Sequence, residues 1–139
     1  MIYIIYSHSR EDGTVVHYLD NDFNKAKDKF ISMAPSWTQI DGGDNGLNLV
    51  AMKLDGMPTL NLLNDLIKQN PDTYAWDKST QKFLDSLFEL PDETYIDNFM
   101  TDDVIGWLDT EKGIDGFDAL DLPDEEWDEY VKEYVNAIL

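Results

Sequence analysis

The feature that most constrains the fold is a stripe of apolar residues near the C-terminal end of the sequence. Large apolar side chains recur there at positions i, i+3, i+4, i+7, i+8 and i+11, namely Trp127, Tyr130, Val131, Tyr134, Val135 and Ile138. A helix of 3.6 residues per turn places all of them on one face, whereas a strand would divide them between two faces. We therefore predict a helix that begins near Pro123 and packs against a core by this stripe.

The opposite face of this predicted helix is acidic. Its like-charged pairs, four residues apart, are Asp124–Asp128, Glu125–Glu129 and Glu129–Glu133. Each such pair costs roughly 0.2–0.5 kcal/mol in an isolated helix. The helix dipole stabilises acids in the first turn and so accounts for Asp124, Glu125 and Glu126. Because Glu129 and Glu133 have no such local reason, the pattern indicates a surface that faces something basic.

The charge of the whole chain points the same way. The sequence has 29 acidic and 10 basic residues, a net charge of −19, and its pI is about 4.1. Residues 1–70 hold nine acids and six basic residues, a net of −3, whereas residues 71–139 hold 20 acids and four basic residues, a net of −16. Such a chain is repelled by nucleic acid and by anionic membranes, which argues against direct binding to either. A charge asymmetry between halves indicates an interaction surface.

Length and composition define the broad class. A chain of 139 residues with 42% hydrophobic residues predicts one folded domain, residues 1–139. The absence of cysteine excludes a disulfide framework and a thiolate metal site. The opening stretch "MIYIIYSHSR" is too short for a signal peptide or a membrane span. We expect a cytoplasmic protein, located in the host cytoplasm if a phage encodes it.

The first half of the chain reads as two β-hairpin-and-helix units. Strand-like alternation on both sides of Asp12-Gly13 predicts a hairpin with a two-residue turn, which would place His8 opposite His17. A helix follows, capped by Asp20 or Asp22, with Phe23, Ala26, Phe30 and Ala34 near helical spacing and Pro35 as its stop. The stretch 36–56 predicts a second hairpin in which Leu47, Leu49 and Ala51 alternate with Asn48, Val50 and Met52. Pro58 opens a second helix that closes before Pro71.

The second half reads as helical and acidic. We predict a helix over 78–90 that Pro91 ends, a short helix over "DETYIDNFM", and a helix capped by Thr101 with Gly113 as its C-terminal stop. The stretch "IDGFDALDL" predicts a loop before the final helix. The fold class is therefore α+β, with N-terminal ββα-ββα units over 1–70 and an acidic helical subregion over 71–139.

Motifs for catalysis or metal binding are weak in this sequence. Neither "DGGDNGLN" nor "DTEKGIDGFDALD" fits the spacing of a calcium-binding loop. The two histidines of the hairpin would need further ligands to hold zinc. No phosphate-binding loop, dinucleotide fingerprint or nucleophile elbow is present. We predict no catalytic residues, no metal site and no cofactor, and hence a protein that is not an enzyme.

Carboxylates in rows about 5–6 Å apart on a rigid helix imitate the dense negative charge of a nucleic-acid backbone. A protein with such rows can occupy the basic groove of a nucleic-acid-binding protein and exclude its substrate. The predicted partner-binding residues are Asp118, Asp121, Asp124, Glu125, Glu126, Asp128, Glu129 and Glu133. Aromatic residues among the acids would add apolar contacts and specificity, the candidates being Tyr95, Phe99, Trp107 and Phe117.

In general character, the acidic residues 72–139 resemble small acidic inhibitor proteins: DNA-mimic antagonists made by bacteriophages, and immunity proteins that neutralise nuclease toxins. The resemblance lies in composition, and no motif is shared. It implies an inhibitor that binds a basic nucleic-acid-handling protein, a nuclease or a defence effector. Phage counter-defence is the first interpretation and bacterial immunity the second. The third, from a different class, is an acidic scaffold or oligomerisation module, for which a homodimer is an open alternative.

Overall fold

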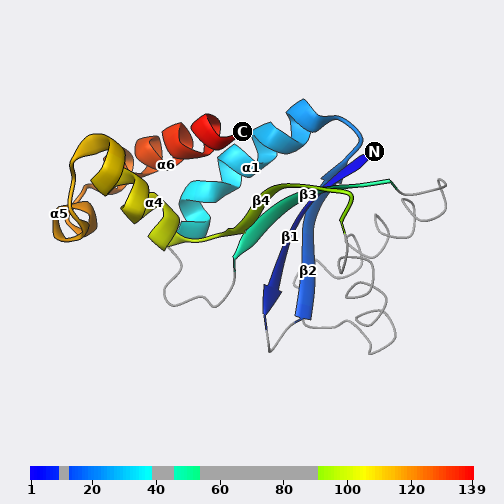
Figure 1. Ribbon diagram of the computed structural model, residues 1–139, viewed down its shortest axis with the longest axis horizontal. Coiled ribbons are helices and arrows are strands. Elements are labelled where there is room, and N and C mark those ends of the chain that lie inside the picture. Colours follow the sequence, from blue (N-terminus) through cyan, green and yellow to red (C-terminus); the bar gives the residue numbers. More distant parts are fainter. Residues whose placement is uncertain (10–12, 39–45, 54–90) are drawn as a thin grey trace.

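A four-stranded antiparallel sheet with helices on one face forms the described part of the chain (Figure 1). The computed structural model describes residues 1–9, 13–38, 46–53 and 91–139. The strands are β1 (Ile2–Ser9), β2 (Gly13–Asp20), β3 (Leu47–Met52) and β4 (Glu93–Phe99), in the spatial order β2-β1-β3-β4. The helices are α1 (Phe23–Thr38), α4 (Thr101–Trp107), a π-helical turn η1 (Leu108–Lys112), α5 (Gly116–Leu120) and α6 (Asp124–Ile138).

The α+β class is confirmed, as are the N-terminal hairpin with its helix and the helical C-terminal part. The predicted helices that begin at Pro58 and that end before Pro91 lie outside the described residues. None of the described helices is long and apolar enough to cross a membrane.

The N-terminal hairpin has a different register from the predicted one. Ser9 pairs with Gly13, so the two-residue turn at Asp12-Gly13 is wrong, because three residues separate the paired ends. The pairing shifts between Ile5 and Tyr6, because Ile5 pairs with Tyr18 and Tyr6 pairs with Val16. His17 is therefore the extra residue of a β-bulge in β2. His8 consequently lies opposite Thr14, and the predicted His8–His17 pairing is also wrong.

Helix α1 begins as predicted and ends later than predicted. The Asp22 carboxylate accepts a hydrogen bond from the Asn24 N–H at 2.9 Å, which caps the first turn. Ala26, Phe30 and Ala34 are buried, as their spacing predicts. Pro35 does not stop the helix, which continues to Thr38.

The final turn of α1 persists because it is tied to the helices that follow in sequence. The Thr38 hydroxyl donates to the Pro35 carbonyl oxygen at 2.9 Å and accepts a hydrogen bond from the Trp127 indole N–H, also at 2.9 Å. The Thr101 hydroxyl donates to the Thr38 carbonyl oxygen at 2.8 Å. Thr38 therefore joins α1 to both α4 and α6. Because the Thr101 hydroxyl donates to Thr38, Thr101 does not cap α4, and the N-cap of α4 is Met100.

Three further predictions of secondary structure are wrong. Residues 36–38 are helical and β3 pairs with β1 and β4, so the second hairpin over 36–56 does not form. The stretch "DETYIDNFM" forms strand β4 instead of a short helix, with Ile96 and Phe99 buried. The stretch "IDGFDALDL" contains helix α5 instead of a loop, because the Asp115 carboxylate caps it by accepting the Asp118 N–H at 2.9 Å.

A buried amide organises the junction of three strands. The Asn48 side chain donates to the carbonyl oxygens of Tyr6 and Gly46 and accepts the Asn98 N–H at 2.8 Å. Asn98 has a φ of 53°, in the left-handed region that asparagine tolerates. Its backbone passes so close to Gly46 that a Cβ on Gly46 would lie 2.6 Å from the Asn98 Cα. The contact between β3 and β4 therefore requires glycine at position 46.

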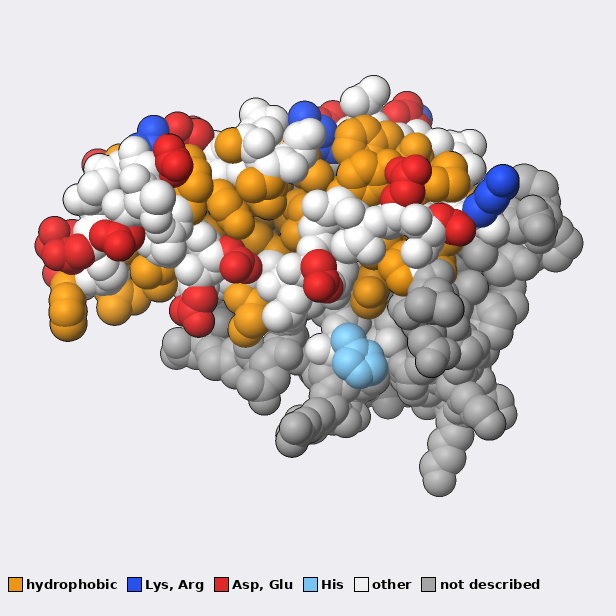
Figure 2. All heavy atoms as spheres, viewed as in Figure 1, with side chains coloured by type: hydrophobic (Ala, Val, Ile, Leu, Met, Phe, Trp, Pro, Cys, Tyr) orange, Lys and Arg blue, Asp and Glu red, His pale blue; other side chains and the backbone are white. Residues whose placement is uncertain are grey.

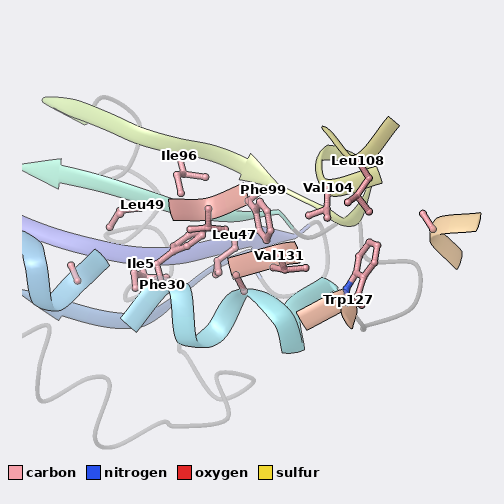
Figure 3. Packing of buried hydrophobic residues seen from close by; sticks show 14 residues of the cluster. Ile5, Phe30, Leu47, Leu49, Ile96, Phe99, Val104, Leu108, Trp127 and Val131 are labelled. Carbon is pink, nitrogen blue, oxygen red and sulfur yellow. The ribbon is translucent and has the colours of Figure 1, made fainter. Parts of the chain in front are cut away.

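The core lies between the sheet and the helices (Figure 3). Phe30 of α1 and Phe99 of β4 meet edge to face there, with 5.7 Å between ring centroids. From α6, Trp127, Val131 and Val135 are buried, which confirms most of the predicted stripe. Tyr130 and Tyr134 are half-buried, and Ile138 is 44% exposed. Gly113, in the left-handed conformation at φ 66°, ends η1 as predicted.

Candidate acidic binding surface

Four of the predicted partner-binding acids lie together along an open groove between α1 and α6. The groove is lined by Ile31, Glu125, Glu126, Glu129, Tyr130, Lys132, Glu133 and Asn136. All but Ile31 come from α6. The 3.6-residue repeat turns its polar positions away from the buried stripe, while Tyr130 belongs to the stripe and lies half-buried beside them. The groove thus combines four carboxylates with two half-buried apolar side chains, Ile31 and Tyr130.

Two of these four carboxylates have partners within the chain. The Lys112 ammonium lies 2.6 Å from a Glu133 carboxylate oxygen, and it also lies 5.6 Å from the centre of the Trp107 ring. The hydrogen bond to Glu133 raises the pKa of Lys112. Lys132 lies 4.0 Å from Glu129. Glu133 therefore has a close partner within the chain, whereas Glu129 is 79% exposed and its contact with Lys132 is long, so its charge stays largely uncompensated.

Glu125 and Glu126 differ from those two residues. Both are exposed in the first turn of α6, and within the described part of the chain neither has an ion-pair partner. The positive end of the helix dipole stabilises them there. Together with the largely uncompensated Glu129, these two glutamates are the acids of the groove with negative charge left to offer a partner.

The remaining predicted acids lie elsewhere. Asp118 and Asp121 are exposed on α5 and at its C-terminal end, and Asp124 is the first residue of α6. Asp128 is half-buried on α6 and takes part in further contacts. The groove lining includes none of these four aspartates. The predicted set therefore divides into four glutamates along the groove and four aspartates outside it, two of them at α5 and two on α6.

Acidic and apolar side chains alternate on the visible surface. Figure 2 shows carboxylates dispersed singly over the helical end of the molecule, with hydrophobic side chains between them. On this face the acids do not form one unbroken sheet of charge. A partner that fits such a surface needs both cationic and apolar groups.

The four candidate aromatic residues differ in accessibility. Phe99 is 1% exposed and belongs to the core, so it cannot contact a partner. Tyr95 and Trp107 are half-buried, and a hydrogen bond from the Tyr95 hydroxyl to Glu93 raises the pKa of Tyr95 to about 12. Phe117 on α5 is 84% exposed. Leu120, one turn further along α5, is 72% exposed. The sequence does not reveal it, because a predicted loop does not orient its side chains.

The two histidines lie on opposite faces of the sheet. His17 Nε2 is 2.9 Å from the Ser7 hydroxyl, and the His17 ring lies against Trp37 with 5.2 Å between centroids. His8 Nδ1 is 3.0 Å from the Thr14 hydroxyl, on the face opposite to that of its neighbour Ser7. The two imidazoles therefore cannot share a zinc ion. Among the described residues, no group of three or more His, Asp or Glu side chains is placed to hold a metal.

Comparison with known proteins gives no further guide. No protein-family model matches the chain, and neither a curated protein nor a solved structure is significantly similar to it. The function must therefore be inferred from the charges and surfaces described above.

Proposed function

We propose that this protein is a non-enzymatic acidic inhibitor that binds a basic nucleic-acid-handling protein and blocks its nucleic-acid site. In this proposal it acts stoichiometrically, as a DNA mimic does, and a nuclease or defence effector is its target. Phage counter-defence is the setting we favour.

The observation that carries the proposal is the density of negative charge on ordered elements. Residues 91–139 contain 16 acidic residues and only two lysines, Lys112 and Lys132. Both lysines already pair with glutamates of α6. Most of these carboxylates are exposed, so their charge is directed to solvent. Repulsion among them destabilises the folded state, and a basic partner would relieve it.

The groove between α1 and α6 is the proposed centre of contact. Glu125 and Glu126 would meet lysine or arginine side chains that otherwise bind phosphates. Ile31 and Tyr130 would give those long side chains an apolar surface for their stems. Association would be fast at low salt through electrostatic steering, and its affinity would fall with salt.

The test is capture of partners from a bacterial lysate at low and then at moderate salt, with mass spectrometry of the retained proteins. The groove variant is Glu125→Gln/Glu126→Gln/Glu129→Gln, which spares Glu133 and its contact with Lys112. Its matched control is Asp28→Asn/Asp109→Asn/Glu111→Gln, which removes three exposed acids outside the groove. Each retained protein is then purified and assayed for nucleic-acid binding with and without this protein.

The proposal predicts that wild type and the control retain the same nucleic-acid-binding protein and displace its DNA or RNA, while the groove variant does neither. Equal retention by all three proteins would place the contact elsewhere. If no nucleic-acid-binding protein is retained by wild type at low salt, the proposed function is wrong.

A further inference from the structure

Helix α5 packs with its small residues inward and its large residues outward. Ala119 is 2% exposed and belongs to the core cluster, and a Cβ on Gly116 would lie 3.8 Å from the Ile105 side chain. Phe117 and Leu120 are 84% and 72% exposed. A surface helix normally buries its large apolar residues, each of which gains about 1.5–3 kcal/mol when fully buried. In α5 that gain is not realised within the described fold.

The outward orientation is imposed by the local structure. Asp115 caps the start of α5, and the C-terminal end is held by backbone bonds from Asp121 to Asp118 and from Leu122 to Ala119. Phe117 and Leu120 are three residues apart and therefore lie on the same side of the helix. Turning them inward would require Gly116 and Ala119 to leave their contacts. Figure 1 places this helix at the end of the molecule away from the sheet.

The charge around this apolar pair identifies the kind of partner. Asp115, Asp118 and Asp121 are all exposed and belong to the same short stretch. A second copy of the chain is a poor occupant, since a symmetric contact through α5 would set these aspartates against their own equivalents. An apolar pocket bordered by lysine or arginine complements both the apolar pair and the aspartates.

We propose that Phe117 and Leu120 form an apolar anchor that inserts into a pocket with a basic rim on the partner protein. This inference rests on the proposed function, which supplies a basic partner, and adds the contact that gives specificity. Charge along the groove would attract the partner, and the anchor would slow its dissociation.

The test uses two synthetic peptides with equal numbers of lysines, one flanking Leu-Trp-Leu and the other flanking Gly-Ser-Gly. Affinities for the full-length protein are measured by calorimetry, and the contacts by amide chemical shifts of the ¹⁵N-labelled protein. The anchor variant is Phe117→Ser/Leu120→Gln, whose sites are exposed enough to leave folding intact. The matched control is Ile138→Gln, another exposed apolar residue.

We expect wild type to bind the Leu-Trp-Leu peptide about tenfold or more tightly than the Gly-Ser-Gly peptide. A ratio of this size is typical of the loss of one anchor residue at an interface. The anchor variant should lose this preference, while Ile138→Gln and the groove variant should keep it. Shift changes should centre on residues 115–121. Equal affinity of wild type for both peptides, or a preference that survives in the anchor variant, would overturn the proposal. So would a dimer in sedimentation that the anchor variant abolishes, because a second copy would then be the occupant.

The two proposals fail in different ways. If the lysate yields no nucleic-acid-binding protein but the peptide preference behaves as expected, the proposed function fails and the anchor stands. If a nucleic-acid-binding protein is captured and the anchor variant holds it as tightly as wild type does, the anchor fails and the proposed function stands.

Discussion

At the scale of single residues, Thr38 joins three helices through one side chain and one carbonyl group. Thr38→Val keeps the shape of the side chain but leaves the buried Trp127 indole N–H without its acceptor. An unsatisfied buried donor costs about 1–3 kcal/mol, so we expect a loss of that order in the free energy of unfolding. Urea denaturation followed by circular dichroism measures it.

The control for this prediction is a double-mutant cycle with Trp127→Phe, which removes the donor as well. Because both substitutions break the same hydrogen bond, the double variant should be less destabilised than the sum of the single variants. Strictly additive effects would mean that the two side chains do not share this bond in solution.

His17 makes stability depend on pH. Burial lowers its pKa from 6.5 to about 4, so the folded protein holds the imidazole neutral. The unfolded chain binds a proton at higher pH than the folded one does. The contribution of the neutral His17 imidazole to the free energy of unfolding is therefore complete above pH 6.5 and is lost as the pH falls toward 4. Between pH 7 and pH 5 we expect a loss of about 2 kcal/mol from this group.

An NMR titration of the two imidazoles checks the pKa, and urea midpoints at pH 7 and pH 5 check the stability. His17→Gln should lose less stability over this interval than wild type does. A His17 midpoint near 6.5 would contradict the expectation and show that the ring is hydrated in solution.

At the scale of elements, two glycines should respond to alanine with opposite signs. Gly106 is exposed in α4, and an added Cβ would meet nothing within 4 Å. Gly106→Ala should stabilise the protein by about 0.5–1 kcal/mol through helix propensity. Gly46→Ala should destabilise it by about 1–3 kcal/mol, because the Asn98 backbone blocks the new methyl group. Thermal unfolding of both variants measures the two changes in stability. If Gly46→Ala stabilised the protein as Gly106→Ala should, this account of the contact between β3 and β4 would be wrong.

Elements with a long regular period could be predicted from the sequence, and those without one could not. The α6 stripe and the Ala26–Phe30–Ala34 spacing both predict helices that form. In β4, the buried Ile96 and Phe99 are three residues apart, a helix-like spacing that arises because irregular pairing breaks the strand alternation. Helix α1 continues past Pro35 to Thr38, which makes hydrogen bonds with Trp127 and Thr101, residues distant in sequence.

The candidate surface was predictable in the same partial way. The acids of the groove share a helix face, and helical periodicity alone groups them. Lys112 lies 21 residues before Glu133, so no local spacing reveals their contact. The exposure of Phe117 and Leu120 follows from the inward packing of Ala119, which depends on the tertiary fold.

At the scale of the whole molecule, the net charge of −19 should make stability depend on salt. Raising NaCl from about 20 mM to about 500 mM screens repulsion between exposed acids, since the Debye length falls from roughly 20 Å to a few ångströms. We expect the urea midpoint to rise with salt while the slope of the transition stays the same. A midpoint that falls would mean that attraction between opposite charges outweighs the repulsion.

The outer position of β4 in the described sheet has a consequence for handling the protein. An open strand edge is a template on which another molecule can add a strand. Exposed Glu93 and Asp97, together with the left-handed Asn98, disfavour such addition at this edge. Near the pI of about 4.1 the chain has no net charge, and two copies no longer repel each other. Acidified stocks should therefore become turbid and bind thioflavin, whereas stocks kept near neutral pH should remain clear.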